Sequence, residues 1–155
     1  MSSTSTPKGT VHSVPTGSKQ LYATSSPFEQ KIGYYRAVRH GSHIFVSGTT
    51  AVDPQSPPTA PQILYPGDAR QQTQVALEEC IAAVRALGGT EGSVVRVRMF
   101  VANAEDCMKV GEGFREVLGK HRGGEVGAAA TMIVVQNGFV DGRMLVEVEV
   151  DAVAE

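Results

Sequence analysis

The chain has 155 residues, a net charge of −2 and 19% charged residues. This length suits one domain, which buries enough apolar surface to fold without a disulfide or a metal ion. The scattered basic residues exclude an extended nucleic-acid surface, and every apolar run is shorter than the roughly 18 residues that span a membrane.

The cysteines and the N-terminus predict a cytoplasmic location. Cys80 and Cys107 show no ligand spacing, and two thiols in a chain of this size are typical of a reducing compartment. The N-terminus lacks the charged-then-apolar pattern of a secretory signal. We therefore expect a cytoplasmic protein.

Residues 1–28 are rich in Ser, Thr, Pro and Gly. Segments of this composition bury too little apolar surface to pack firmly. We expect the first ten or so residues to be disordered and the remainder of 1–28 to form an extended, flexible arm. A single folded domain is then predicted over residues 29–155.

Two strands are predicted next, over Tyr35–Arg39 and His43–Val52, because a turn with Gly41 separates two β-rich segments. The following segment, 54–67, contains five prolines. Proline fixes φ and removes a backbone donor, so this segment is predicted to be a loop.

The first helix is predicted to begin at Asp68, with Gln71 three residues later as in a capping box. Its apolar residues recur at helical spacing, and Gly88-Gly89 ends it. That stripe consists of Leu77, Cys80, Ile81, Val84 and Leu87.

A second helix is predicted after Asn103, which can cap it. Its apolar stripe comprises Cys107, Val110, Phe114, Val117 and Leu118. Gly111 and Gly113 each weaken a helix by about 1 kcal/mol relative to alanine, so we expect them to serve close packing or a pocket. Cys107, in the first turn, is either a core residue or a thiol with a lowered pKa.

Three further strands are predicted, over Val94–Val101, Thr131–Gln136 and Met144–Ala152. In the first, alternation places Val95, Val97, Met99 and Val101 on one face, and Arg96 and Arg98 on the other. In the last, alternation places Val146, Val148, Val150 and Ala152 on one face, and Glu147, Glu149 and Asp151 on the other.

The predicted order is therefore ββαβαββ, an α+β fold with a mixed sheet and both helices on one face. Strand–helix–strand crossovers require parallel strands, and the flanking pairs are expected to be antiparallel hairpins. Two helices cover only one face of such a sheet. We expect a homo-oligomer to cover the other face.

The three acids of the last strand are candidates for chemistry. They either form ion pairs with Arg96 and Arg98, or one of them acts as a general acid/base or positions a water molecule. The spacing does not choose among the three. We expect no metal site, since His40 and His43 straddle a turn, and no cofactor, since no phosphate loop or dinucleotide motif is present.

The segment IFVSGTTAVD (44–53) resembles the I-F-x-S-G-Q strand of the Rid family, the YjgF-like reactive-intermediate deaminases. YYRAVRHG, the helix from Asp68, VVRVRMFVANAEDC and LVEVEVDAVA match in the same order, over about residues 33–154. This resemblance implies a chorismate-mutase-like fold. It also implies a homotrimer whose sheets form a central barrel, with a small-molecule cleft between each pair of subunits.

The resemblance also implies a site for the hydrolysis of imines and enamines. Tyr34, Ser47 and Gly48 fall on the family's tyrosine and its S-G pair, where they would contact the substrate. Glu147 falls on the glutamate that positions water. The resemblance thus selects Glu147 from the three acids.

The sequence departs from the family where an arginine binds the substrate carboxylate. Ala130 stands at that position, followed by Thr131, and Met132 replaces a cysteine. Thr49 replaces the glutamine after S-G, and Gly111 replaces an asparagine. Alanine cannot form the bidentate pair of a guanidinium with a carboxylate, so a larger, neutral ligand is expected beside Ala130, Thr131 and Met132.

Arg36 resembles a residue of a subgroup that also lacks the usual arginine. It could supply a cation from another direction, or be an ordinary surface arginine.

The expected function is an enzyme acting on a small reactive intermediate, and the resemblance suggests secondary metabolism as its setting. Its reaction would be a deaminase-like hydrolysis, a tautomerisation, or a related isomerase or lyase step. Glu147 would be the acid/base, and Tyr34 and Ser47 would orient the substrate. The alternatives are a trimer that binds a small molecule without catalysis and a chaperone-like trimer that acts through its surface.

Overall fold

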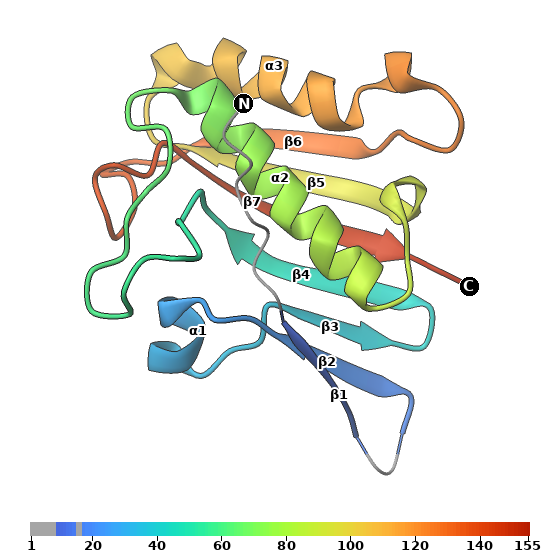
Figure 1. Cartoon of the computed structure of the whole chain (residues 1–155). Helices are drawn as coiled ribbons and strands as arrows, with labels where there is room; N and C mark the ends of the chain where they lie inside the picture. The colour runs from blue at the N-terminus through green and yellow to red at the C-terminus, as the bar shows by residue number, and fades with distance from the viewer. Residues whose placement is uncertain (1–8, 15–16) are drawn as a thin grey trace.

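The structure is a computed structural model that describes residues 9–14 and 17–155. One sheet of seven strands, in the order β1-β2-β3-β4-β7-β5-β6, carries α2 and α3 on one face (Figure 1). The strands are β1 (Thr10–Ser13), β2 (Lys19–Ala23), β3 (Ala37–His40), β4 (His43–Thr49), β5 (Val94–Val101), β6 (Ala129–Val134) and β7 (Val146–Val153). The helices are α1 (Pro27–Ile32), α2 (Ala69–Ala86) and α3 (Cys107–Leu118), with short 3-10 turns at Glu91–Ser93, Ala104–Asp106 and Lys120–Arg122.

The predicted α+β class with a mixed sheet is confirmed, and from β3 to β7 the elements follow each other as ββαβαββ. None of the helices within the described residues is long and apolar enough to cross a membrane.

The expectation of a flexible arm over residues 1–28 is wrong for part of that segment. β1 and β2 form an antiparallel hairpin, and β2 pairs with β3, so the sheet begins at Thr10. The physical reason is Tyr22, which is 5% exposed and belongs to the core. The expected disorder of residues 1–8 lies outside the described residues.

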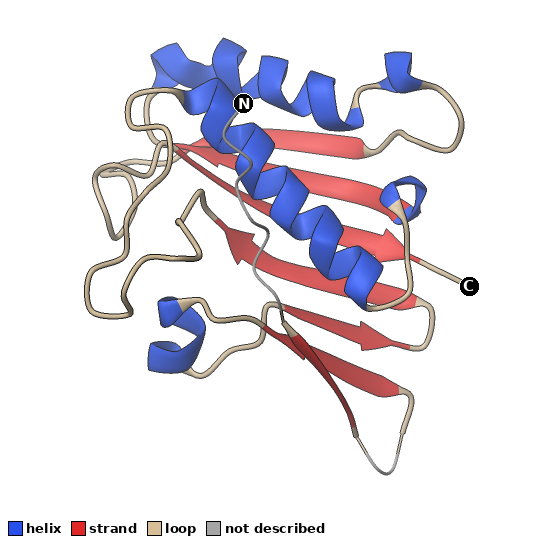
Figure 2. Cartoon of the chain, viewed as in Figure 1, coloured by secondary structure: helices blue, strands red, loops and turns tan. Residues whose placement is uncertain are grey.

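The last two strands do not form the predicted hairpin. β7 pairs antiparallel with both β4 and β5, whereas β6 pairs parallel with β5 at the sheet edge. β4 and β5, which α2 connects, are therefore parallel but separated by β7. Figure 2 shows this order across the sheet. Because β7 lies between β4 and β5, its acidic residues Glu147, Glu149 and Asp151 lie opposite residues of β5.

A bulge in β5 changes which valine faces the core. The register with β7 shifts between Val94 and Arg96. Val94 is therefore buried, whereas Val95, predicted to face the core, is 46% exposed. Strand alternation assumes an unbroken register, and a single extra residue reverses it upstream of the bulge.

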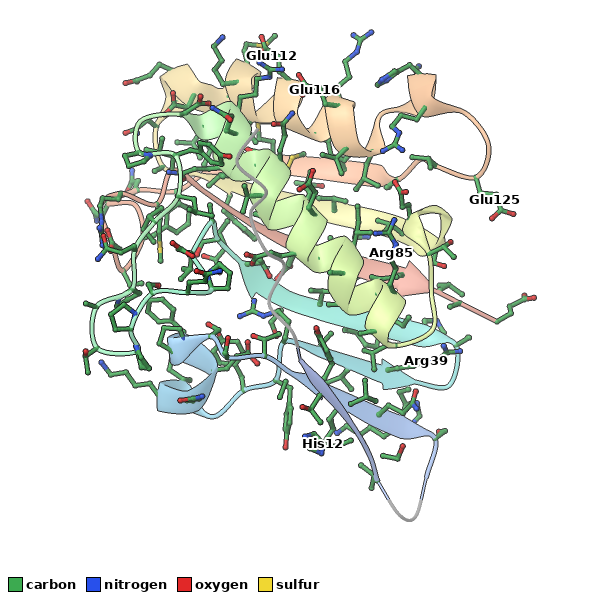
Figure 3. The ribbon with its side chains drawn as sticks, viewed as in Figure 1. His12, Arg39, Arg85, Glu112, Glu116 and Glu125 are labelled. Atoms are coloured by element: carbon green, nitrogen blue, oxygen red, sulfur yellow. The ribbon has the colours of Figure 1, made fainter. Side chains whose placement is uncertain are left out.

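The N-terminus of α2 has the predicted cap at Asp68 but only half of a capping box, because the Asp68 backbone N–H donates to the carbonyl of Tyr65 instead of to Gln71. The Asp68 carboxylate accepts a hydrogen bond from the Gln71 backbone N–H at 3.0 Å and another from the Gln71 side-chain amide at 2.8 Å. At the other end the helix stops at Ala86, and Gly88 adopts a φ of +94°. Arg39 of β3 donates to the carbonyl of Leu87 at 2.7 Å, which joins the helix end to the sheet (Figure 3).

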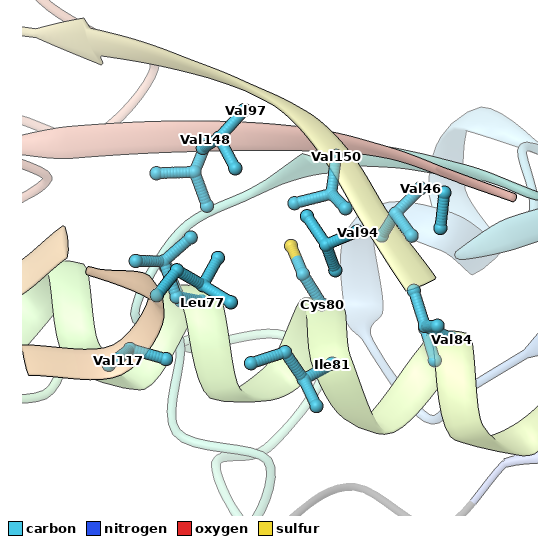
Figure 4. Close-up of a cluster of buried hydrophobic side chains, with 14 of the residues drawn as sticks. Val46, Leu77, Cys80, Ile81, Val84, Val94, Val97, Val117, Val148 and Val150 are labelled. Atoms are coloured by element: carbon cyan, nitrogen blue, oxygen red, sulfur yellow. The ribbon is translucent and has the colours of Figure 1, made fainter. Parts of the chain in front are cut away.

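The apolar stripe of α2 meets valines from the strands in the core (Figure 4). Leu77, Cys80 and Val84 are fully buried there, as predicted. The strand side chains against them all point toward the helix layer: Val46, Val94, Val97, Val148 and Val150. A β-carbon on Gly113 would lie 2.7 Å from the carbonyl oxygen of Arg70, so this glycine lets α3 approach α2 closely, as predicted.

The face of the sheet away from these helices carries exposed apolar side chains. Phe45 is 50% exposed, Val95 and Ile133 are each 46% exposed, and Val153 is 40% exposed. These residues come from β4, β5, β6 and β7, so the apolar surface crosses most of the sheet. Its cover by another subunit stays a prediction.

Candidate functional site

A cavity of about 720 Å³ lies where β4 loses its regular pairing with β7. Its walls come from β2, the β2–α1 segment and α1, from the segment between α1 and β3, and from the end of β4 with the loop that follows it. One side of α2, residues 138–144 and the start of β7 complete them. Six of the predicted site residues line it together: Tyr34, Arg36, Ser47, Gly48, Thr49 and Glu147.

Glu147 differs from the two acids that follow it on β7. Glu149 and Asp151 each lie 3.2 Å from Nη1 of Arg98, so both form the ion pairs that we considered. The register places Glu147 opposite Phe100 instead, and its carboxyl lines the cavity. Burial raises the pKa of Glu147, the Glu149 charge raises it further, and Arg36 acts in the opposite direction.

The irregular stretch of β4 makes room for Glu147. A β-carbon on Gly48 would overlap Oε1 of Glu147, so only glycine allows this approach. The register with β7 shifts between Val46 and Thr49, and in this irregular stretch Ser47 and Gly48 line the cavity. The S-G pair thus shapes the space around the carboxyl.

Arg36 is buried, with 7% of its surface exposed, so the interpretation as a surface arginine is wrong. Its Nε donates to Oε2 of Glu29 at 3.2 Å. Its Nη1 donates to the carbonyl of Gly48 at 3.0 Å and to Oγ1 of Thr49 at 2.8 Å. These bonds hold α1, β3 and the irregular part of β4 together.

Hydroxyl groups complete the polar wall of the cavity. Tyr34 accepts a hydrogen bond from Nη2 of Arg36 at 3.4 Å, and the guanidinium lies 5.6 Å from the centre of its ring. The Ser47 hydroxyl donates to the carbonyl of Tyr35 at 2.7 Å, and Thr49 donates to the carbonyl of Ser47 at 2.8 Å. Because the hydroxyl proton of Ser47 is donated to Tyr35, its oxygen is left to act as a hydrogen-bond acceptor in the cavity.

Two acidic residues of this region were not anticipated. Glu29 is 4% exposed and accepts hydrogen bonds from the backbone and side chain of Thr24, as well as from Arg36. It fell at the edge of the segment expected to be flexible, and no local pattern indicates its burial.

The second is Glu79, which lines the cavity from α2 and is partly buried. Burial raises the pKa of its carboxyl from the ordinary 4.5 to about 8, while Arg36 acts in the opposite direction. A sequence signal exists, because Glu79 lies three residues after Ala76 and four before Ala83, both fully buried. The next residue, Cys80, points into the core, where burial raises the pKa of its thiol to about 12.

Three predicted substrate-binding residues lie elsewhere. Ala130, Thr131 and Met132 belong to β6, at the opposite edge of the sheet, and do not line the cavity of their own chain. Met132 is partly buried against the core. A role for this segment in the site would require a second subunit.

Metal-binding groups do not gather anywhere in the described ranges. No three His, Cys, Asp or Glu side chains of residues 9–14 and 17–155 are placed to hold an ion together.

Comparison with known proteins identifies relatives along most of the chain. The family model described as endoribonuclease L-PSP matches residues 24–154. An uncharacterized protein of Streptomyces coelicolor is 36% identical over 130 residues, which cover 83% of this chain and 87% of that protein. A Mycobacterium tuberculosis member of the YjgF/YER057c/UK114 family is similar in structure, with 31% identity, a TM-score of 0.70 and coverage of 88% of this chain and all of that chain.

A third relative is TdcF of Escherichia coli, provisionally named a reactive intermediate deaminase. It is 27% identical over 89 residues, which cover 57% of this chain and 64% of TdcF. A crystal structure of TdcF with bound serine gives a TM-score of 0.63 at 26% identity and covers 79% of this chain and 88% of that chain.

Proposed function

The chain belongs to the endoribonuclease L-PSP family, which contains the YjgF-like Rid proteins, and from that premise we propose that it hydrolyses a small imine or enamine in its cavity. The observation that carries the proposal is the placement of Glu147. Its carboxyl lines the cavity beside Gly48, without the ion pairs that engage Glu149 and Asp151.

Glu147 has the properties that this reaction requires of an acid/base. The carboxylate takes a proton from water as the water oxygen bonds to the imine carbon. Glu147 passes this proton to the imine nitrogen, which gives a carbinolamine. Glu147 then takes the hydroxyl proton of the carbinolamine and gives it to the nitrogen as the C–N bond breaks, which yields a carbonyl compound and ammonia or an amine. A raised pKa suits Glu147 to accept a proton and return it to the leaving nitrogen.

The other cavity residues have supporting roles in the proposal. Tyr34 and Ser47 orient the substrate through their oxygens, and Gly48 lets it approach the carboxyl of Glu147. Thr49 holds Arg36 at 2.8 Å and thereby keeps the wall in place. Tautomerisation of an enamine to an imine would use the same proton transfers.

The proposed assembly is a homotrimer with a site between each pair of subunits. The exposed apolar face of the sheet supports it, because Phe45 and Ile133 would then be covered. A neighbouring subunit would bring β6, and with it Ala130 and Thr131, to the cavity. β6 itself contains no arginine, so the proposed substrate lacks the carboxylate of a simple amino-acid-derived imine.

The test is ammonia release from a panel of imines generated in solution, some with a carboxylate, like 2-aminoacrylate, and some without. We expect turnover of carboxylate-free imines, and a fall of about 10²-fold or more in kcat for Glu147→Gln. Glu149→Gln is the matched control and should retain activity, because Glu149 pairs with Arg98 outside the cavity wall.

Unchanged turnover in Glu147→Gln would contradict the assigned role. Saturable binding of panel compounds without any product would favour the non-catalytic alternative.

A further inference from the structure

The charges around the cavity do not balance. Among the described residues that line it, Arg36 is the one basic side chain, whereas Glu79 and Glu147 are both acidic. A cavity wall with unpaired carboxyl groups favours positively charged ligands, provided that the charge of Arg36 is already neutralised by another residue.

Arg36 is neutralised by a residue behind the wall. Its ion pair with Glu29 is almost fully shielded, with 9% and 3% of the two side chains exposed. Nη1 donates to the carbonyl of Gly48 and to Oγ1 of Thr49, and Nη2 donates one of its two N–H groups to the Tyr34 oxygen. The guanidinium therefore offers no free fork for a substrate carboxylate.

Glu79 and Glu147 have no such partner. Neither carboxyl forms an ion pair with any side chain in the described part of the chain. Both are at least partly buried, and burial raises the pKa of each. A positive charge in the cavity would compensate this loss of solvation.

Beside the hydroxyl groups described above, the wall has a large apolar part. It is contributed by Pro27, Phe28, Val52, Phe139, Val140 and Met144. Val140 is 86% exposed and Ile32, which also lines the cavity, is 71% exposed, so the apolar surface extends to the cavity mouth. An occupant should therefore combine a cationic group with an apolar body.

We infer that the cavity selects an apolar monocation, a protonated amine or iminium without a carboxylate, whose charge is balanced by Glu79 and Glu147. This inference deepens the proposed function, on which it rests, by naming the substrate class. The iminium form is also the form of an imine that water attacks most readily, so the same carboxyl groups would favour the reactive species.

Proton release is a second consequence. In the empty cavity at pH 7, Glu79 with its pKa of about 8 holds a proton for most of the time. A bound cation stabilises the carboxylate and lowers that pKa, so binding expels a proton. Affinity for a fixed cation should accordingly increase as the pH rises toward 8.

The test uses three probes with the same ring: benzylamine, benzyl alcohol and benzoate. Calorimetric titration of the intact protein at pH 7 should show benzylamine binding about tenfold or more tighter than the other two. Repeating the titration in buffers of different ionisation enthalpy should show proton release with benzylamine alone.

Variants that remove one carboxyl charge test whether Glu79 and Glu147 cause the preference for benzylamine. Glu79→Gln and Glu147→Gln should each weaken benzylamine binding several-fold and leave benzyl alcohol unchanged, and Glu79→Gln should abolish most of the proton release. Glu78→Gln is the control on α2, because Glu78 is exposed and lies outside the cavity wall. Glu149→Gln is the control on β7.

The inference would be overturned if benzoate bound as tightly as benzylamine or more tightly. It would also be overturned if no probe bound at millimolar concentration, or if both cavity variants kept the wild-type affinity for benzylamine. Failure of the proposed function has a different signature. In that case benzylamine selectivity would persist while no imine is turned over.

Discussion

Glu147, Glu149 and Asp151 leave β7 on the same side but meet different neighbours. Alternation predicted their common face correctly, because it depends only on local strand geometry. Their roles depend on which residues of β5 lie opposite, and that register follows from the insertion of β7 between β4 and β5. The choice of Glu147 came from the family resemblance, and its catalytic role stays a proposal.

A single β-carbon at Gly48 should be enough to disturb the site. In Gly48→Ala the new methyl group would overlap Oε1 of Glu147 and displace the carboxyl. We expect kcat for imine hydrolysis to fall by about tenfold or more, since a catalytic group held about 1 Å out of place loses most of its effect. Steady-state kinetics measure this.

Gly127→Ala is the matched control, because a β-carbon there would meet nothing within 4 Å. Wild-type kcat in Gly48→Ala would contradict the account of the S-G pair.

At the level of helices and strands, sequence patterns predicted several features of the two main helices. The sequence predicted the N-cap of α2 at Asp68, the apolar stripe of this helix and the close packing at Gly113. The β1–β2 hairpin and the central position of β7 were not predicted. The hairpin lies in a segment whose Ser, Thr, Pro and Gly content predicted a flexible arm. The position of β7 depends on pairing with strands distant in the chain, for which neither composition nor periodicity carries a signal.

The two glycines of α3 should respond oppositely to alanine. Gly113→Ala would place a β-carbon 2.8 Å from Cβ of Thr73 and force α2 and α3 apart, so we expect a loss of about 1–3 kcal/mol in the free energy of unfolding. At Gly111 the nearest atom would be Cε of Met132 at 3.9 Å, so Gly111→Ala should stabilise by up to about 1 kcal/mol.

Urea unfolding at one fixed protein concentration compares the two variants. Equal changes in both would show that helix propensity, rather than interhelical contact, governs this helix.

For the whole molecule, the exposed apolar face predicts assembly. We expect light scattering at micromolar concentration to give about three times the chain mass of 16.4 kDa. Phe45→Glu should lower this mass, because it places a charge on the face to be covered. Met108→Glu should not, because Met108 is exposed on α3, away from that face. A monomeric wild-type mass would refute the trimer.

The candidate site was predictable only in part at this scale. Six residues that are scattered over more than a hundred positions of the sequence converge on one cavity, and the family resemblance identified all of them. The roles of Arg36 and Glu79 follow from their burial and, for Arg36, from its ion pair with Glu29. No sequence motif indicates these features. Ala130 lies on β6, outside the cavity of its own chain, and only the proposed trimer would bring it to the site.

The N-terminal hairpin also bears on how the protein should be produced. Thr10 pairs with Ala23 at the α1 end of the sheet, and a β-carbon on Gly9 would overlap the ring of Tyr22, a cavity residue. A tag fused directly to Gly9 would thus begin close to the cavity. β7 runs away from the cavity for eight residues before the chain ends at Glu155, so a C-terminal tag is the safer choice for kinetics and ligand titration.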